Sequence, residues 1–341
     1  MATIHDVAQL AGVSIKTVSR VVNREPHVSA GTRARVDRAI QVLNYRPNIA
    51  ARTLAGSRAY LVGLYFDNPS AGYVSQMQSG ALRACRAAGY HLVIEQLAGS
   101  SVEVQNQLRQ SLAAVRMDGV VLSPPVCDRG EVLDLLDALA VPHVRIAPAR
   151  ELGRGPYVCM DDGRAAQEMA RRLLALGHRR FGFIKGHPDH AAAEIRWRGF
   201  ANALAAAGLI LGPRDTWQGD FSFRSGSEGA RRLLSRGPRP TAIFASNDDM
   251  ALGAIAMAHR LGLRIPDDLS VAGFDDSPGA EAVWPPLTTI RQPVAEMTAG
   301  AVNMLIDGHG PGRSEPQLFD FELVVRGSTG PPPIVDLAAG L

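Results

Sequence analysis

The sequence predicts an α/β protein in which a small helical module precedes a larger body of two parallel sheets flanked by helices. Its 341 residues exceed the roughly 150 residues of one ordinary domain, so we expect more than one. The first 45 residues carry apolar side chains at helical spacing. From Tyr60 onward, short apolar runs alternate with helical stretches of about 12–16 residues, which is typical of parallel sheets covered by helices.

The composition argues against several classes of protein. Hydrophobic residues make up 46% and charged residues 20%, a globular balance that excludes a largely disordered chain. No apolar run reaches the about 18 residues of a membrane-spanning helix, and the N-terminus has no basic-then-apolar signal, so we expect a cytoplasmic protein without a membrane partner. Three scattered cysteines (Cys85, Cys127 and Cys159) fit a reducing compartment better than a disulfide framework or a zinc site.

Charge is divided unevenly along the chain. Residues 1–60 contain nine basic and three acidic side chains, whereas the rest of the chain contains 27 basic and 30 acidic ones. The first segment is therefore +6 and the remainder −3. A basic module on a mildly acidic body favours a polyanionic partner for the module, although a basic surface that binds nothing is an alternative.

The basic module reads as three short helices. Thr3, with an acidic residue three positions later, forms a capping-box pattern at the start of the first. Gly12 ends that helix because glycine accepts the left-handed backbone that a helix end needs. Ser14 caps the second helix, and the third begins at Ser29 or Thr32.

The first two helices and the glycine between them have the form of a helix-turn-helix. In that geometry the start of the second helix enters the major groove of DNA and directs side chains at the bases. Those side chains would be Ile15, Lys16, Thr17 and Arg20. An ordinary helical hairpin with surface charges is the alternative, and the spacing together with the basic charge favours DNA binding.

A short segment over residues 48–56 follows Pro47. It contains good helix formers and ends at a glycine. Isolated helices shorter than about 12 residues are marginal, so we expect this one to need support from a partner.

The body contains two series of strand-like apolar runs. The first four cover residues 61–66, 91–96, 119–123 and 143–147, and the second four cover residues 157–160, 181–185, 241–246 and 269–275. The series is long enough for two parallel sheets.

The chain resembles the lactose/galactose repressor (LacI/GalR) family. The headpiece motif TIHDVAQLAGVSIKTVSRVVN is highly specific, and the body contains RWRGF at 196–200, PTAIFASNDDMALGA at 240–254 and IPDDLSVAGFDD at 265–276. The resemblance covers roughly the whole chain. It implies a DNA-binding headpiece, a hinge helix, a two-lobed core like periplasmic sugar-binding proteins, and a homodimer.

The resemblance also implies domain boundaries. The headpiece takes residues 1–46, the hinge 47–58, the effector-binding core 59–330 and a tail 331–341. Within the core, lobe 1 takes about 59–160 and 293–320, and lobe 2 takes about 162–290 and 323–330. The chain would cross between the lobes near 160–163, 290–293 and 320–323.

Family positions assign the DNA contacts. Base readout falls on Ile15, Lys16 and Arg20. Leu54, beside Ala55, matches the hinge leucine that wedges into the minor groove and kinks the DNA. The remaining matches are phosphate or positioning contacts, and they fall on Thr3, Thr17, Ser19, Asn23, His27, Ser29 and Thr32.

Three aspartate pairs follow strand-like runs, at 161–162, 248–249 and 275–276. One interpretation is helix capping, which we expect of at least one member of each pair. Another is ligand binding, because ligands bind outside the carboxyl ends of parallel strands. By family match the effector site would contain Asp67, Tyr73, Arg196, Phe221, Asn247 and Asp275, a set of polar and aromatic groups that suits a sugar.

One segment departs from the family pattern. Many members have an acidic residue after the fourth strand of the first lobe, where this chain reads Val144-Arg145-Ile146-Ala147-Pro148-Ala149-Arg150. The change leaves open whether the Ala147-Pro148 loop excludes ordinary hexoses. Arg145 or Arg150 would meet an acidic ligand or, as we favour, face solvent on a loop.

His187 and His190 flank Pro188-Asp189 in an expected loop. Two histidines near an aspartate resemble part of a metal site. No third ligand on a helix is evident in the sequence, so we predict no metal there.

The segment 250–258 is apolar nearly all round. A helix that covers a sheet needs one apolar face, so a second face buried in a homodimer would explain the excess. Burial between elements of the same lobe is the alternative.

These observations predict a repressor-like transcription regulator that binds double-stranded operator DNA as a homodimer under control of a sugar-like effector. We expect no cofactor, no catalytic residue and no enzymatic activity. A solute-binding protein or an enzyme on the same core are rival interpretations, as is a regulator that responds to a nucleobase or an acidic metabolite. The operator, the effector and the sign of its effect stay open.

Overall fold

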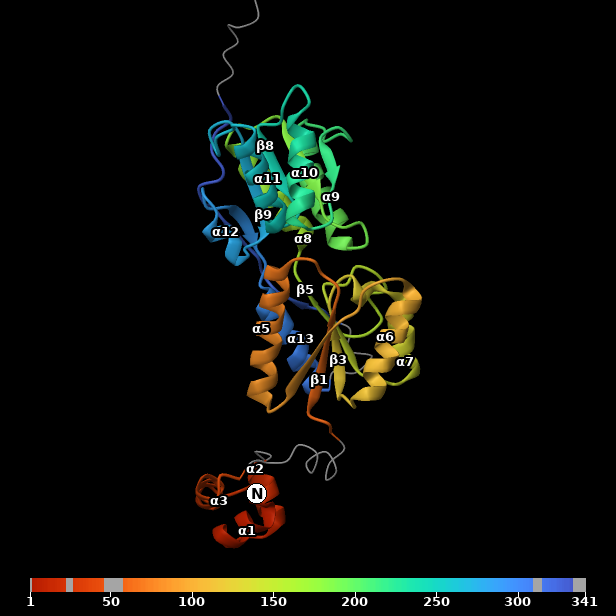
Figure 1. The fold of residues 1–341 in the computed structure, drawn as a ribbon, viewed down its shortest axis with the longest axis vertical. Coiled ribbons are helices and arrows are strands. Elements are labelled where there is room, and N and C mark those ends of the chain that lie inside the picture. The colour runs from red at the N-terminus through yellow and green to blue at the C-terminus, as the bar shows by residue number, and fades with distance from the viewer. Residues whose placement is uncertain (1, 23–26, 46–57, 309–314, 334–341) are drawn as a thin grey trace, which may run out of the picture. The chain divides into compact units, whose positions relative to one another are not determined.

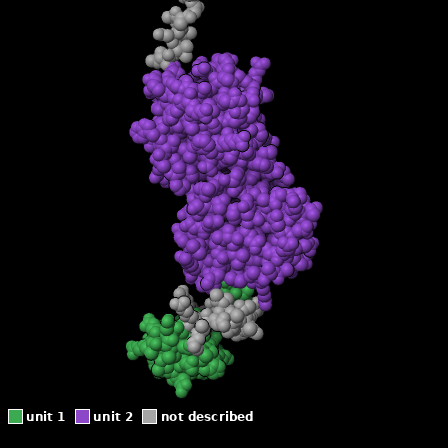
Figure 2. All heavy atoms as spheres, viewed as in Figure 1, with its two compact units in different colours: residues 1–60 green, residues 61–341 purple. Residues whose placement is uncertain are grey.

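A computed structural model describes residues 2–22, 27–45, 58–308 and 315–333. The chain divides into two compact units, residues 1–60 and residues 61–341 (Figures 1 and 2). Each unit has a hydrophobic core of its own, and each is described by itself.

Unit 1 is a three-helix module. Its helices are α1 (Ile4–Ala11), α2 (Ile15–Val22) and α3 (Ala30–Val42). The predicted capping box is present, because the Thr3 side chain accepts a hydrogen bond from the Asp6 N–H and the Asp6 carboxylate accepts one from the Thr3 N–H. Gly12 ends α1 with a φ of 62°, and Ser29 rather than Thr32 caps α3. Apolar side chains from all three helices close the core, with Val7, Val18 and Val36 fully buried.

Unit 2 contains two six-stranded sheets. The first has the strand order β11-β5-β4-β3-β1-β2, and the second β12-β10-β9-β8-β6-β7. All neighbouring strands are parallel except β12, which runs antiparallel to β10. The α/β class with two parallel sheets is therefore confirmed.

The strands of the first sheet are β1 (Leu61–Phe66), β2 (His91–Gln96), β3 (Gly119–Leu122), β4 (His143–Ile146), β5 (Tyr157–Cys159) and β11 (Gln317–Leu318). Those of the second are β6 (Phe181–Lys185), β7 (Thr216–Gln218), β8 (Ala242–Ala245), β9 (Ser270–Asp275), β10 (Thr288–Arg291) and β12 (Glu322–Val324). All eight predicted strands are present. The four that were not predicted are β7, β10, β11 and β12, which have two to four residues each.

Helices cover both faces of each sheet. In the first lobe, the part of unit 2 built on the first sheet, α5 (Ala71–Ala88) and α13 (Val294–Ile306) lie on one face, and α6 (Ser101–Ala114), the short helix η1 (Val126–Asp128) and α7 (Gly130–Ala138) lie on the other (Figure 1). In the second lobe, built on the second sheet, α8 (Asp162–Ala175) packs with α9 (Ala191–Ala206) and α10 (Phe223–Leu234) packs with α11 (Asp248–Arg260). The short α12 (Pro278–Ala282) contacts α11.

The chain passes between the lobes three times. The passages lie between β5 and α8, between β10 and α13, and between β11 and β12. Figure 2 shows unit 2 as two masses joined at a narrower waist. Because strands of both sheets end toward this waist, side chains that follow them meet there.

The apolar helix α11 is surrounded by elements of its own lobe. It packs against α10, α12 and the strands β8 and β9. Its buried residues include Met250, Ala254 and Ile255, and Met257 packs on the same core. Contacts within the lobe therefore account for most of the apolar surface that we assigned to a dimer.

Glycines allow α10 and α11 to approach closely. A Cβ atom on Gly253 would lie 2.1 Å from the Phe223 carbonyl oxygen, and one on Gly226 would lie 2.1 Å from the Met250 carbonyl oxygen. Real Cβ atoms do not approach backbone so closely, so any side chain at these positions forces the helices apart.

We expect Gly253→Ala to destabilise unit 2 by about 1–3 kcal/mol, because overpacking shifts the backbone of a closed core. Thermal unfolding measured by circular dichroism tests this. Gly153→Ala is the matched control, because a Cβ atom there meets no atom within 4 Å. A melting temperature of Gly253→Ala equal to that of the control would contradict the close-packing argument.

Candidate functional site

The helix α2 presents one face to the core of unit 1 and another to solvent. Val18 and Val21 are buried. Lys16 and Arg20 are exposed, as is Ile15, which leaves 42% of its surface accessible. The hydroxyl of Ser14 accepts a hydrogen bond from the Thr17 N–H at 3.2 Å, which fixes the start of the helix. The exposed face thus combines Ile15 and Lys16 in the first turn of α2 with Arg20 in its last turn.

The other predicted DNA contacts differ in how exposed their side chains are. Thr3 and Ser29 are exposed caps of α1 and α3, and His27 is also exposed. Thr17, Ser19 and Thr32 are half-buried. Asn23, Leu54 and Ala55 lie outside the described residues.

A second candidate site is a small cavity at the waist of unit 2. Its volume is about 40 Å³. The first lobe contributes uncharged residues that follow its strands, namely Asn68, Ser70, Tyr73, Pro124 and Ala147. The second lobe contributes Asp162, His190, Ala192, Arg196, Phe221, Asn247 and Asp275, and Gln292 follows β10 at a passage between the lobes.

Arg196 is the central cation of this cavity. Its Nε donates to Asp162 Oδ1 at 2.7 Å and its Nη1 donates to the Ser246 carbonyl oxygen at 2.6 Å. Nη1 also lies 3.8 Å from Asp275 Oδ1. The guanidinium stacks 3.6 Å from the centroid of the Phe274 ring, a cation–π contact that fixes its plane.

Asp275 is a buried carboxylate in a strained backbone position. Its φ is 121°, and its Oδ1 accepts a hydrogen bond from Gln292 Nε2 at 2.5 Å. Burial raises the pKa of Asp275 well above its usual value, and the nearby Arg196 opposes that rise. The carboxylate is therefore held where strand β9 ends, facing the cavity.

Asn247 and Phe221 hold each other in place. The Asn247 side chain caps α11 by accepting from the Met250 N–H at 3.0 Å, and its Nδ2 donates to the Phe221 carbonyl oxygen at 2.9 Å. Phe221 has a φ of 70°, and its ring lies 5.1 Å from that of His190. Burial lowers the pKa of His190 to about 4, so its ring is neutral at pH 7.

The aspartate pairs have different roles. Asp161 caps α8 by accepting from the Arg164 N–H, so the capping prediction holds for that pair. It is wrong for the other two, because Asn247 caps α11 and Ser277 precedes α12.

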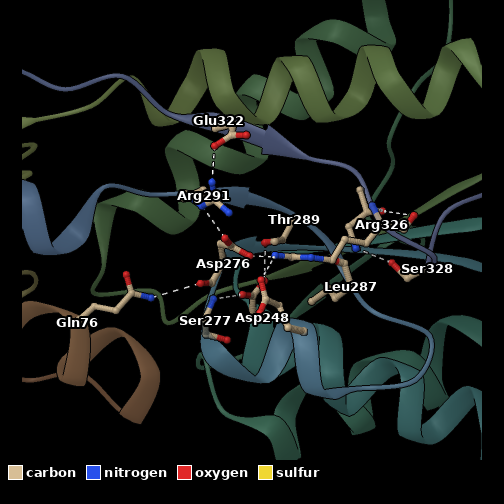
Figure 3. Close-up of polar contacts among 12 residues, drawn as sticks. Gln76, Asp248, Asp276, Ser277, Leu287, Thr289, Arg291, Glu322, Arg326 and Ser328 are labelled. Atoms are coloured by element: carbon tan, nitrogen blue, oxygen red, sulfur yellow. Dashed lines mark hydrogen bonds and ion pairs between the residues drawn. The ribbon is translucent and has the colours of Figure 1, made fainter.

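Asp248 and Asp276 belong instead to a polar network next to the waist (Figure 3). Asp248 accepts from the Thr289 hydroxyl at 2.6 Å and from the Ser277 N–H at 2.7 Å. Asp276 pairs with Arg291 and Arg326, each at 2.7 Å. Gln76 of α5 donates to the Asp276 carbonyl oxygen at 3.5 Å, which links the two lobes.

Comparison with known proteins accounts for this combination of sites. The sequence matches the bacterial regulatory proteins of the lacI family over residues 3–48 and a periplasmic binding protein-like domain over residues 170–329. The transcriptional repressor PurR of Erwinia tasmaniensis is 34% identical over 98% of this chain and 99% of its own length. The ribose operon repressor of Escherichia coli is 34% identical over 90% of this chain and 92% of its own. This chain belongs to the lacI family.

Solved structures agree with this assignment. A Lac repressor dimer bound to operator and the anti-inducer ONPF has a TM-score of 0.78 and 30% identity, covering 96% of this chain and 99% of that one. A complex of the transcriptional regulator CelR with cellobiose has a TM-score of 0.71 and 32% identity, covering 96% of this chain and 100% of that one. The lacI-family protein is accordingly a DNA-binding transcriptional regulator under the control of a small-molecule effector.

Five of the six predicted effector residues of this lacI-family member line one cavity, and Asp67 does not. Its carboxylate lies 3.9 Å from Arg129 Nη2, and the following residues Asn68 and Ser70 line the cavity instead. Asn68, Ser70, His190 and Gln292 were not predicted to belong to the site. The pair at 161–162 did signal a polar group at the end of a strand, and Asp162 is that group.

The departure from the family at Arg145 has a structural explanation that we did not predict. Arg145 is fully buried, which contradicts both a solvent-facing position and a meeting with an acidic ligand. Its Nε donates to the Cys127 carbonyl oxygen at 2.9 Å, its Nη1 to that of Glu151 at 2.8 Å and its Nη2 to Asp128 Oδ1 at 3.2 Å. Arg150 is exposed, as expected.

Asp128 completes the arrangement around Arg145. Its carboxylate accepts hydrogen bonds from the N–H groups of Ala149 and Arg150, at 3.0 and 3.1 Å. The pair thereby fixes the loop that begins with Ala147, the residue that lines the cavity.

In the part of the chain that the structure describes, no three histidine, cysteine or acidic side chains gather as metal ligands, so His187 and His190 belong to no such group. No helix there has the length and apolar character needed to cross a membrane.

We expect Arg145→Met to destabilise unit 2 by about 3–5 kcal/mol, because it leaves the Asp128 carboxylate buried without its cation. Urea unfolding gives the free energy directly. Arg150→Met, an exposed neighbour, should change it by less than about 0.5 kcal/mol. Equal effects of the two substitutions would mean that the buried pair does not hold the loop.

Proposed function

We propose that this regulator is a repressor that reads its operator through the exposed face of α2. The observation that carries the proposal is the division of that helix, with Val18 and Val21 buried and Ile15, Lys16 and Arg20 outward. Arginine and lysine suit guanine edges, and an apolar side chain suits the methyl group of thymine. The remaining contacts, to phosphates, would fall on Thr3, Thr17, Ser19, Asn23, His27, Ser29 and Thr32.

The regulator would act as a homodimer on a pseudo-palindromic site. A twofold dimer presents two copies of α2 to two half-sites, and the solved Lac repressor bound to operator is a dimer. Two segments at 47–58, each with Leu54 and Ala55, would meet at the centre of the operator and open a base step. This role places the protein in the cytoplasm with its DNA.

The effector proposed for the cavity at the waist is a small, neutral, polar ring compound of the sugar or nucleobase class. Phe221 and Tyr73 offer aromatic faces, while Arg196, Asp275 and Asn247 offer polar groups at fixed positions. An acidic metabolite is disfavoured, because the one guanidinium of the cavity is already engaged by Asp162 and Arg145 is engaged elsewhere.

Admitting such a ligand requires the lobes to separate. A cavity of about 40 Å³ holds one or two water molecules at most, whereas ligand pockets usually measure about 300–1,000 Å³. We therefore propose two lobes that move relative to each other about the three passages. The first lobe takes about 59–160 and 293–320, and the second takes about 162–290 and 323–330. A ligand that prefers one lobe arrangement changes DNA affinity by the difference between the two states. Binding, rather than turnover, is the role proposed for the cavity.

We expect Arg20→Ala to weaken binding to an operator selected from random DNA by about 1–3 kcal/mol and to relax base preference at one position per half-site. Arg38→Ala removes one positive charge from an exposed position of α3 and is the charge-matched control. Fluorescence anisotropy on operator and on random duplex measures both affinities. Equal losses on the two duplexes would assign Arg20 to phosphate contact alone.

A thermal-shift screen of pentoses, hexoses and nucleobases identifies the effector class. A ligand at about 100 times its Kd should stabilise unit 2 by about 2.7 kcal/mol. We expect Arg196→Met to abolish that shift, because it removes the cation of the cavity, while Arg198→Met, an exposed position on the same helix, keeps it. The unliganded melting temperature of each variant is the control for folding. A shift that survives in Arg196→Met would place the effector elsewhere.

A further inference from the structure

A larger cavity of about 770 Å³ lies on the second lobe, away from the waist. Its lining comes from the start of β6, the loop after α9 and the loop after α10. Phe181 is the first residue of β6, and Pro240 precedes β8. The cavity therefore opens at the amino ends of these parallel strands, whereas the cavity at the waist lies at their carboxyl ends.

Apolar side chains form part of the lining of this cavity, and we call them its floor. Phe181, Leu204, Leu211 and Leu233 line it, and each is at least nine-tenths buried. Ile210 lines it as well and exposes 91% of its surface, the largest fraction among the big apolar side chains that the structure describes. An apolar body entering the cavity would cover the exposed surface of Ile210 and the small exposed parts of the other four side chains. Removing this apolar surface from water is favourable.

Four arginines surround the floor: Arg179, Arg180, Arg214 and Arg236. Arg179 Nη1 donates to the His178 carbonyl oxygen and Arg180 Nε to that of Arg239, each at 2.9 Å. Among the described residues, no carboxylate lies within 4.0 Å of any of the four guanidinium groups. We call the cavity with these four side chains the arginine-rimmed pocket.

Other arginines close to this pocket are paired with an acidic side chain. Arg231 and Arg232, one turn before Arg236, both pair with Glu228, at 2.6 and 2.8 Å. The single acidic residue of the pocket lining, Asp215, accepts a hydrogen bond from the Gly212 N–H at 3.0 Å. The lining therefore has a net charge of +3 from four arginines and one aspartate, on a body that is acidic as a whole.

We propose that the arginine-rimmed pocket binds a small organic anion with an apolar body, such as a medium-chain or aromatic carboxylate. The planar guanidinium fork of arginine matches a carboxylate or phosphate group bidentately, so the rim selects the charged end. The buried side chains of the floor accommodate the apolar part. The volume lies within the range of about 300–1,000 Å³ that small-molecule sites occupy.

The fluorescent probe 8-anilinonaphthalene-1-sulfonate has this chemistry, and titrating it into the full-length, DNA-free protein tests the proposal. Its emission rises on transfer to an apolar site. We expect Arg214→Met/Arg236→Met to raise the Kd of the probe by about tenfold or more, because it removes two guanidinium groups that would donate charge-assisted hydrogen bonds to the sulfonate. Arg231→Met/Arg232→Met is the matched control and should leave the Kd unchanged. Both double variants should melt like the wild type.

Competition separates the charge from the apolar body. Octanoate should displace the probe, whereas 1-octanol and inorganic phosphate at the same concentration should not. Equal displacement by 1-octanol would reduce the site to an apolar surface, and equal displacement by phosphate would reduce it to a simple anion site. Displacement by an acidic peptide but not by octanoate would assign the surface to a polypeptide. Each of these results, or an unchanged Kd in Arg214→Met/Arg236→Met, overturns the proposal.

Discussion

The guanidinium of Arg196 holds together the end of the second lobe that faces the waist. It reaches from α9 to Asp162 at the start of α8, to the Ser246 carbonyl oxygen after β8, and toward Asp275 at the end of β9. These three places belong to different elements, and each comes directly after a strand or a passage of the chain. A buried cation among two carboxylates is stable only when its hydrogen bonds are satisfied. The positions of the cavity residues therefore depend on this side chain.

A second buried arginine, Arg145, joins separate segments of the first lobe but leaves no charge at the cavity. Arg145 and Asp128 neutralise each other behind the loop at 147–151, and only Ala147 of that loop lines the cavity. The two lobes thus use an arginine in opposite ways. One guanidinium lines the cavity and the other fixes the wall.

The elements that were predicted correctly are those marked by a local pattern in the sequence. Caps, glycine stops and apolar runs are short-range signals, and they located the three helices of unit 1 and the eight longest or most apolar strands. The short strands β7, β11 and β12 form at sheet edges through long-range pairing that no local pattern reveals. The burial of Arg145 was missed for a similar reason, because its partners lie five to 18 residues away and are mostly backbone carbonyl groups. Resemblance to the family found Arg196, Phe221, Asn247 and Asp275, but it could not show that Asp67 faces Arg129.

The distribution of charge around the cavity has a consequence for the order of events in ligand binding. Every aspartate and arginine side chain that lines it belongs to the second lobe, and the lining residues of the first lobe are uncharged. A ligand entering between separated lobes would be attracted and oriented by the second lobe alone. The first lobe would then close over a ligand that is already aligned, and it would add the uncharged contacts of Asn68, Ser70 and Tyr73. Substitutions in the second lobe would then change which ligands are attracted, and substitutions in the first lobe would change which ligands fit.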